Sequence, residues 1–151
     1  MSLKENLETD LKKSLKEGDK LSLSVVRMLI ASIRNEKIKQ NAELSDDEVV
    51  KLLLREVKTR RQSIEEFKRG NRIDLADKEA SEIKIIQKYL PRSLGEEELN
   101  SLVDSAIQKL GAKSLSDMGK VMGLIMGETK GRAEGQKVST LVRQKLSKLT
   151  E

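Results

Sequence analysis

Apolar residues recur at intervals of three and four along nearly the whole chain, and this spacing constrains the fold more than any other feature. A repeat near 3.6 residues places side chains on one face of an α-helix, whereas a half-buried strand needs strict alternation. The 151-residue chain also contains a single proline, so little interrupts a helical backbone. We therefore expect an all-α protein.

Capping residues divide this pattern into separate helices. The Ser-x-x-Glu spacing of a capping box, which marks a helix start, begins at Ser2, Ser45 and Ser93. Glycines close several of the apolar runs, as expected at helix C-termini. The pattern predicts helices over about 2–18, 20–40, 45–70, 74–89, 93–111, 116–127 and 135–149.

The single proline, Pro91, lies in a junction between two groups of predicted helices. Proline with a following capping serine favours a chain break and a new start at this point. We place a domain boundary here. The sequence thus predicts an N-terminal bundle of about four helices over residues 1–92 and a C-terminal three-helix domain over residues 93–151.

The residue types that the chain lacks exclude many kinds of chemistry. It has no cysteine and no histidine, which removes thiol nucleophiles, imidazole bases, disulfides and nearly every zinc ligand set. We therefore expect no catalytic residues, no metal site and no cofactor. The N-terminus has no apolar segment of the kind found in secretory signals, so we expect a cytoplasmic protein without membrane association.

Aromatic residues are also scarce, with only Phe67 and Tyr89 in the chain. Proteins that read single-stranded bases commonly stack them on aromatic side chains. Sequence-specific RNA reading and DNA specificity are therefore disfavoured. Contacts to a phosphate backbone remain open.

Glycines are concentrated between residues 118 and 146. Gly119, Gly123 and Gly127 are four apart and would form a bare strip on one side of a helix, which predicts close approach of a neighbouring helix, a ligand or a partner. Glycine inside a helix costs about 1 kcal/mol relative to alanine, so the strip needs a reason. Beside it, a buried face is predicted for Met118, Met122, Ile125 and Met126.

A cationic loop follows this predicted helix. Lys130, Gly131 and Arg132 precede a new helix at about Gly135. Backbone N–H groups in a glycine-containing loop and the positive end of a helix together attract phosphate. A glycine-rich helix C-cap with two solvated cations is the alternative, and the motif alone favours it.

Cations dominate the end of the chain, where residues 118–148 contain seven basic and two acidic residues. In the last predicted helix Val138, Leu141, Val142 and Leu149 are expected inward. Lys145 lies within that stripe, so its stem is expected along the apolar surface and we do not count it as a ligand. The predicted polyanion contacts are Lys120, Lys130, Gly131, Arg132, Lys137 and Arg143.

A second basic region lies between Arg55 and Arg72, where seven basic residues occur with three acidic ones. It is a candidate RNA surface. A solvated helix face with local pairs, such as Arg61 with Glu65, is the favoured interpretation.

The segment DMGKVMG…M…KGRAEG…VS.LVR, from Asp117 to Arg143, resembles the C-terminal domain of the GatB/YqeY family. The resemblance extends upstream through Arg27-Met28, Glu66-Phe67, the NRIDL segment 71–75 and the YLP segment 89–91. It implies a protein whose C-terminal part is similar to the tail domain of the GatB subunit of tRNA-dependent amidotransferase, which is implicated in holding tRNA.

Three functions follow as hypotheses. The first is a tRNA-holding protein that uses backbone and shape contacts, with an amidotransferase or an aminoacyl-tRNA synthetase as a candidate partner. The second is an amidotransferase-like accessory activity, a carbon–nitrogen ligase with glutamine as amido donor, although we expect no catalysis by the chain alone. The third is an adaptor whose glycine strip receives a partner helix.

Overall fold

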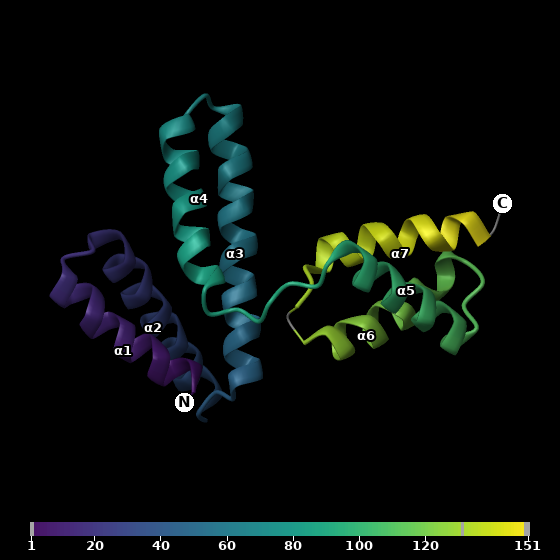
Figure 1. Ribbon diagram of the computed structural model, residues 1–151, viewed down its shortest axis with the longest axis horizontal. Helices are drawn as coiled ribbons and strands as arrows, with labels where there is room; N and C mark the ends of the chain where they lie inside the picture. Colours follow the sequence, from purple (N-terminus) through teal and green to yellow (C-terminus); the bar gives the residue numbers. More distant parts are fainter. Residues whose placement is uncertain (1, 131, 150–151) are drawn as a thin grey trace. The chain divides into compact units, whose positions relative to one another are not determined.

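The computed structural model describes residues 2–130 and 132–149. Within these residues the chain forms seven α-helices and one short 3₁₀ helix, with no strand, which confirms the all-α class (Figure 1). The elements are α1 (Leu3–Glu17), α2 (Lys20–Gln40), α3 (Asp46–Arg69), α4 (Ile73–Gln87), α5 (Glu96–Leu110), η1 (Leu115–Asp117), α6 (Met118–Thr129) and α7 (Gly135–Leu149).

The chain divides into two compact units, Met1–Leu90 and Pro91–Glu151. Helices α1 to α4 belong to the N-terminal unit, and α5 to α7 belong to the C-terminal unit. Each unit has a hydrophobic core of its own. None of the described helices combines the length and the apolar character that crossing a bilayer requires.

Local capping positions the helices of the N-terminal unit. At the start of α1, the Glu5 N–H donates to Ser2 Oγ over 3.1 Å and the Ser2 N–H donates to Glu5 Oε2 over 3.2 Å, which completes a capping box. Gly18 ends the helix at φ 70°, where glycine avoids the Cβ strain of the left-handed region. Ser45 Oγ accepts from the Glu48 N–H at the start of α3.

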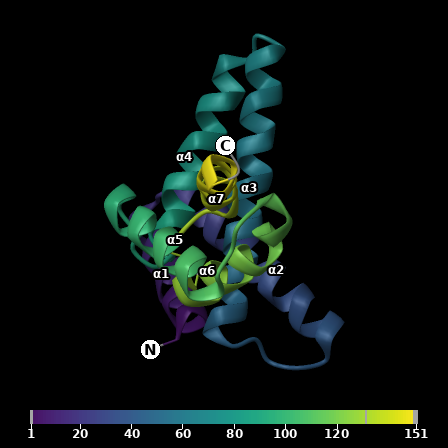
Figure 2. The same ribbon diagram turned by 90° about the vertical axis from the view of Figure 1, so that its right-hand side faces the viewer.

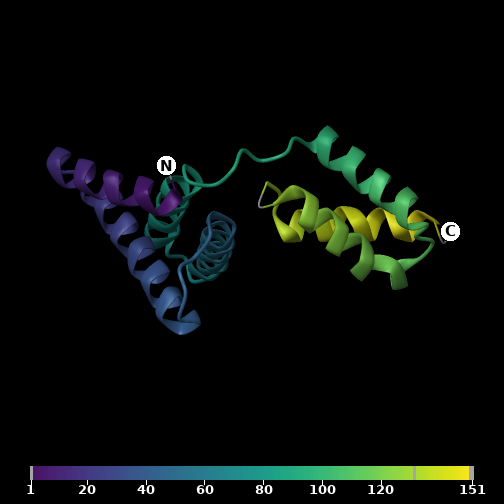
Figure 3. The same cartoon turned by 90° about the horizontal axis from the view of Figure 1, so that it is seen from below.

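In the N-terminal unit α1 pairs with α2, which Figure 3 shows, and α3 pairs with α4, which Figure 2 shows. Leu29, Val49 and Leu53 are fully or almost fully buried in this unit. Leu15, in the last turn of α1, is 61% exposed, whereas its neighbour Ser14 is buried. The core consists of Leu7, Val25, Val26, Leu29, Ile33, Val49, Leu52, Leu53, Val57, Ile83, Ile85 and Ile86.

A partly buried charge cluster joins α3 to α4. Arg60 Nη1 lies 3.0 Å from Glu79 Oε2 and 2.6 Å from Glu82 Oε2. The three side chains are only 15%, 21% and 12% exposed, respectively. Arg60 therefore holds two helices together and does not face solvent as part of an RNA surface.

Two other cations of the second basic region also have carboxylate partners. Arg72 pairs with Asp74 over 3.1 Å, and Arg55 lies 3.9 Å from Glu36. These pairs support a structural interpretation of the region, in which basic residues are matched to carboxylates of the same unit.

Tyr89 connects the end of the N-terminal unit to α1, because its hydroxyl donates to Asp10 Oδ2 over 2.5 Å. Burial and, after it, this hydrogen bond hold the pKa of the Tyr89 phenol well above its ordinary value. A raised folded-state pKa means that the stabilisation is complete below the unfolded-state pKa, about 10, and is lost as the pH rises above it.

We expect Tyr89→Phe to lower the free energy of unfolding by about 1 kcal/mol at neutral pH, because one hydrogen bond to a carboxylate is lost. Urea unfolding at pH 7 and above pH 10 measures this. The difference between the two proteins should shrink at the higher pH. A constant difference would contradict the coupling between Tyr89 ionisation and folding.

In the C-terminal unit α5, α6 and α7 pack as three helices, with η1 leading into α6 (Figure 1). Helix α7 has the bounds that the sequence predicts. Its buried residues are Val138, Val142 and Leu146, whereas Leu149, which was expected inward, is 54% exposed. The cause is its position as the last residue of the helix. The core comprises Leu99, Val103, Ala106, Ala112, Val121, Ile125, Val138, Val142 and Leu146.

The start of α5 differs from the prediction. No capping box forms at Ser93, and the N-cap is Gly95, whose N–H donates to Glu98 Oε2 over 3.4 Å. The backbone before it is held elsewhere, because the Leu94 N–H donates to the Arg132 carbonyl over 2.8 Å. The N-cap of α5 therefore lies two residues later than predicted, directly after this contact with a distant loop.

Candidate nucleic-acid interface

The connection between α6 and α7 begins with a strained lysine. Lys130 caps the C-terminus of α6 at φ 42° and ψ 53°, in the left-handed region, and its N–H donates to the Met126 carbonyl over 3.3 Å. A residue with a Cβ costs about 1–2 kcal/mol in this conformation, which is why glycine or asparagine usually occupies it. The chain thus holds an exposed lysine where glycine would be less costly.

Arg132 fixes the same connection to the segment before α5. Its N–H donates to the Thr129 carbonyl over 2.9 Å, and its Nε donates to the Arg92 carbonyl over 3.1 Å. With the bond from Leu94, three hydrogen bonds involve this one residue. The side chain also lines a shallow cavity beside Glu97 and Glu98. Arg132 therefore has a structural role, and acidic neighbours weaken its predicted attraction for phosphate.

The predicted contact Gly131 lies outside the described residues. Lys130 and Lys137 flank this connection from the two helices, and both are exposed. The first turn of α7 contains no acidic residue, and the nearest carboxylate in the chain is that of Glu134, directly before the helix. Together with Arg132, these two lysines are the cations nearest to the start of α7 along the chain.

The other predicted cations do not join them on one face. Lys137 and Arg143 are six residues apart on α7, which separates them by about 120° around the helix. Lys120 is exposed in the first turn of α6 and acts electrostatically on Asp117, whose pKa is lowered mainly by backbone N–H groups of Lys113 and Ser114. The predicted cations among the described residues thus come from both α6 and α7 and from the connection between them.

The glycine strip is open. Gly119, Gly123 and Gly127 are exposed, and a Cβ built on any of them would meet no heavy atom within 4 Å in the described structure. Among the described residues, a neighbouring helix of the unit therefore does not make the close approach, which was one of the three alternatives. The reason is the orientation of α6, whose fully buried residues are Val121 and Ile125. Close approach of a ligand or of a partner protein to the strip remains a prediction.

The orientation of α6 also corrects its expected core. Ile125 is fully buried as predicted, but Met118, Met122 and Met126 are only partly buried. Val121, four residues before Ile125 on the same face, is a core residue that the sequence pattern did not predict. The four-residue spacing of two β-branched residues, Val121 and Ile125, could have indicated the buried face of this helix.

The left-handed backbone of Lys130 can be tested through its effect on stability. We expect Lys130→Gly to raise the free energy of unfolding of the C-terminal unit by about 0.5–1 kcal/mol, because glycine relieves the left-handed strain. Lys130→Ala removes the same charge and keeps the strain, so its stability should stay near that of the parent. Thermal unfolding of both variants measures the contrast, and equal stabilities of the two would contradict the strain.

Comparison with known proteins adds a family and several relatives. The model of the family described as "Yqey-like protein" matches residues 4–146. Altered inheritance of mitochondria protein 41, mitochondrial, from Pyrenophora tritici-repentis (strain Pt-1C-BFP) is 34% identical over 130 residues, which are 84% of this chain and 71% of that protein. The protein of the same name from Lachancea thermotolerans (strain ATCC 56472 / CBS 6340 / NRRL Y-8284) is 35% identical over 108 residues, 70% of this chain and 58% of its own length.

A third relative has a different name. It is one of the subunits of glutamyl-tRNA(Gln) amidotransferase from Thermococcus gammatolerans (strain DSM 15229 / JCM 11827 / EJ3), and it is 41% identical over 61 residues. The match covers 38% of this chain and 10% of that relative. The relationship to an amidotransferase therefore concerns a small part of the larger protein.

The names of these relatives contradict one expectation. Proteins that match this chain over 84% and 70% of its length are named as mitochondrial, so the prediction of a cytoplasmic protein is wrong. It rested on the missing apolar segment of a secretory signal. Mitochondrial targeting depends on amphipathic, arginine-rich segments instead, which that criterion does not address.

Proposed function

The chain belongs to the YqeY-like protein family, and from this premise we propose that it is a tRNA-binding protein that holds tRNA through backbone and shape contacts. The observation that carries the proposal is the 41% identical stretch shared with the glutamyl-tRNA(Gln) amidotransferase protein. The name of that protein specifies a charged tRNA as the object of its reaction. Because the stretch covers only a tenth of that protein, the proposal concerns tRNA binding and not the amidation itself.

The charges of the C-terminal unit support phosphate contact. Lys130 and Lys137 are exposed and have no carboxylate within ion-pair distance among the described residues. Positive side chains at a helix N-terminus attract phosphate oxygens, and here Glu134, directly before α7, offsets only part of that charge. Lys120 and Arg143 would extend the contact to other faces of the unit, which suits a large curved ligand more than a small anion.

We further propose that the C-terminal unit carries this activity as a separate domain. A tRNA-dependent amidotransferase or an aminoacyl-tRNA synthetase is the partner class that the proposal implies, with the chain in an accessory role. An amidotransferase-like activity of its own is the second candidate, which the same shared stretch favours. Without cysteine or histidine, the chain has neither of the usual groups for releasing ammonia from glutamine.

Binding of folded tRNA at several salt concentrations tests the proposal. About three to five phosphate contacts are expected, and each contributes roughly one unit to the slope of log affinity against log salt. Fluorescence anisotropy with labelled tRNA would measure the slope, with single-stranded RNA of equal length as the control. A slope near zero, or equal affinity for both RNAs, would contradict backbone and shape recognition.

A further inference from the structure

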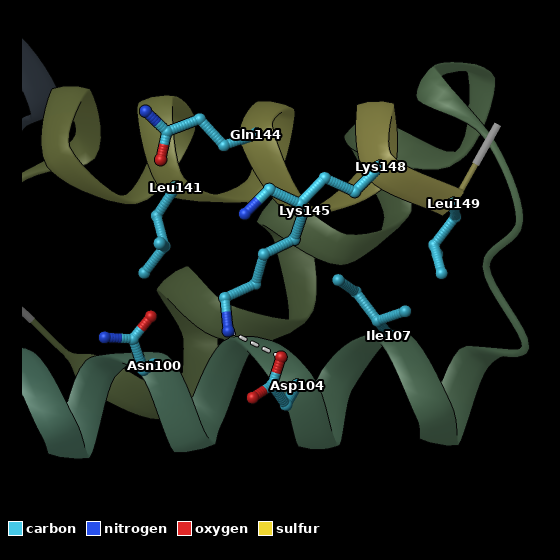
Figure 4. Close-up of a pocket in the computed structure, with 8 residues that line it drawn as sticks. All are labelled: Asn100, Asp104, Ile107, Leu141, Gln144, Lys145, Lys148 and Leu149. Atoms are coloured by element: carbon cyan, nitrogen blue, oxygen red, sulfur yellow. Dashed lines mark hydrogen bonds and ion pairs between the residues drawn. The ribbon is translucent and has the colours of Figure 1, made fainter. Parts of the chain in front are cut away.

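The C-terminal unit has a groove between α5 and α7 that the tRNA proposal does not use along most of its length. The groove contains two cavities, of about 640 and 460 Å³, and both are lined by Asn100, Leu141 and Gln144. They therefore form one continuous depression, of which Figure 4 shows the end nearer the C-terminus of α7. Such volumes are within the usual range of ligand sites in proteins.

Each wall of the groove is a line of residues on one helix face. On α7 the line is Lys137, Leu141, Gln144 and Lys148, with intervals of four, three and four residues. On α5 it is Glu96, Asn100, Asp104 and Ile107, with intervals of four, four and three. These intervals keep each set on one side of its helix.

Apolar side chains lie in the groove along its whole length. Leu94 and Leu99 line the end nearer the start of α5, Leu141 lies in the middle, and Ile107 and Leu149 line the other end. Leu149 is 54% exposed, although a leucine gains about 1.5–3 kcal/mol from full burial. The groove thus offers apolar surface that a nucleic acid backbone would not use.

The charges of the groove are only partly matched. Lys145 Nζ reaches across it to Asp104 Oδ1 over 2.6 Å, as the dashed line in Figure 4 shows. Lys137 and Lys148 have no such carboxylate partner among the described residues. They are eleven residues apart, which is three turns and about 16 Å along the helix axis. Glu96 and Glu134 also line the groove, and they lie at the positive N-terminal ends of α5 and α7, respectively.

We propose that the α5–α7 groove binds an acidic amphipathic α-helix of a partner protein. Two carboxylates of that helix, eleven residues apart, pair with Lys137 and Lys148. Leucine-type side chains four and seven residues after the first carboxylate contact Leu141 and the apolar residues beside it. This is the helix-in-groove mode of recognition, in which residues of one face at i, i+4 and i+7 anchor a helix.

A synthetic peptide of about sixteen residues with this pattern tests the proposal. The fluorescein-labelled peptide carries Glu at positions i and i+11 and Leu at i+4 and i+7, and a control peptide has serine in place of both leucines. Fluorescence anisotropy with the full chain should show saturable binding of the first peptide and at least tenfold weaker binding of the control. Equal binding of the two, or no saturable binding, overturns the proposal.

Exchanging the charges of Lys148 and the facing peptide glutamate tests the orientation of the bound peptide. The core is not disturbed, because Lys148 is exposed. Lys148→Glu should weaken binding of the acidic peptide about three- to tenfold, in line with a pair at the rim of an interface. A peptide with Lys in place of the Glu that faces residue 148 should recover that loss. Failure of the exchanged peptide to recover affinity contradicts the assigned pairing.

An uncharged variant distinguishes this groove from the tRNA proposal. Leu141→Ser should abolish peptide binding and leave tRNA affinity within about twofold, since it removes no cation. Far-ultraviolet circular dichroism checks that the variant keeps its helices. If Leu141→Ser lowers tRNA affinity as much as peptide affinity, the groove belongs to an RNA surface and the proposal is overturned. Peptide binding without any tRNA binding would overturn only the tRNA proposal.

Discussion

Replacing Arg60 with alanine is expected to lower the free energy of unfolding of the N-terminal unit by about 2–4 kcal/mol. The change leaves Glu79 and Glu82 partly buried without the cation that joins α3 to α4. Breaking such a cluster from one side is costly because the remaining charges keep their desolvation and lose their partner. Urea unfolding followed by circular dichroism measures the loss.

Two further variants show whether the charge cluster is the cause. Arg55→Ala removes an exposed arginine of the same helix, 3.9 Å from Glu36, and should change stability by less than about 0.5 kcal/mol. Glu79→Gln and Glu82→Gln, added to Arg60→Ala, should recover part of the loss because they remove the unpaired charges. Equal effects of Arg60→Ala and Arg55→Ala would contradict the structural role of Arg60.

Leu146→Ala is expected to unfold the C-terminal unit and to leave the N-terminal unit folded. Leu146 is fully buried, and removing such a side chain costs about 2–5 kcal/mol. A unit of this size rarely has more than about 3–5 kcal/mol of stability, so the loss approaches the whole of it. Hydrogen exchange should show protection in α1 to α4 and little protection in α5 to α7.

Leu149→Ala is the matched control, since the same substitution is made in the same helix at a side chain that is 54% exposed. It should change stability by less than about 1 kcal/mol. Loss of protection throughout the chain in Leu146→Ala would contradict independent folding of the two units.

Local signals were sufficient for most of the fold. Ser2 and Gly18 mark the two ends of α1 in the structure, and α7 begins at Gly135 as expected. Capping and periodicity act over a few residues, so a single sequence contains them. Ser93 has the same capping pattern, but its prediction was wrong because the adjacent backbone is held by Arg132, about forty residues away.

The candidate site was less accessible to prediction, because it depends on which face of a helix is buried. The glycines of α6 suggested close packing, but α6 buries the face that carries Val121 and Ile125, so the glycines face solvent. Lys145 was expected to lie with its stem along the apolar surface, and its partner Asp104 on α5 could be identified only from the packing of the two helices. Long-range pairings of this kind leave no periodic signal in the chain.

Charge reversal in the cationic connection tests the central claim most directly. Lys130→Glu with Lys137→Glu changes the net charge by the same amount as Lys12→Glu with Lys13→Glu, two exposed lysines of α1. The α1 pair is a better control than Arg60, because reversing Arg60 would also break the ion pairs that join α3 to α4.

If the C-terminal unit holds tRNA at this connection, the first variant should weaken tRNA binding roughly tenfold or more and lower the salt slope by about two units, since each lysine accounts for one phosphate contact. The α1 variant should retain the parent slope and most of the affinity. Equal losses in the two variants, with equal salt slopes, would mean that binding is diffuse attraction to a basic protein and would contradict the claim.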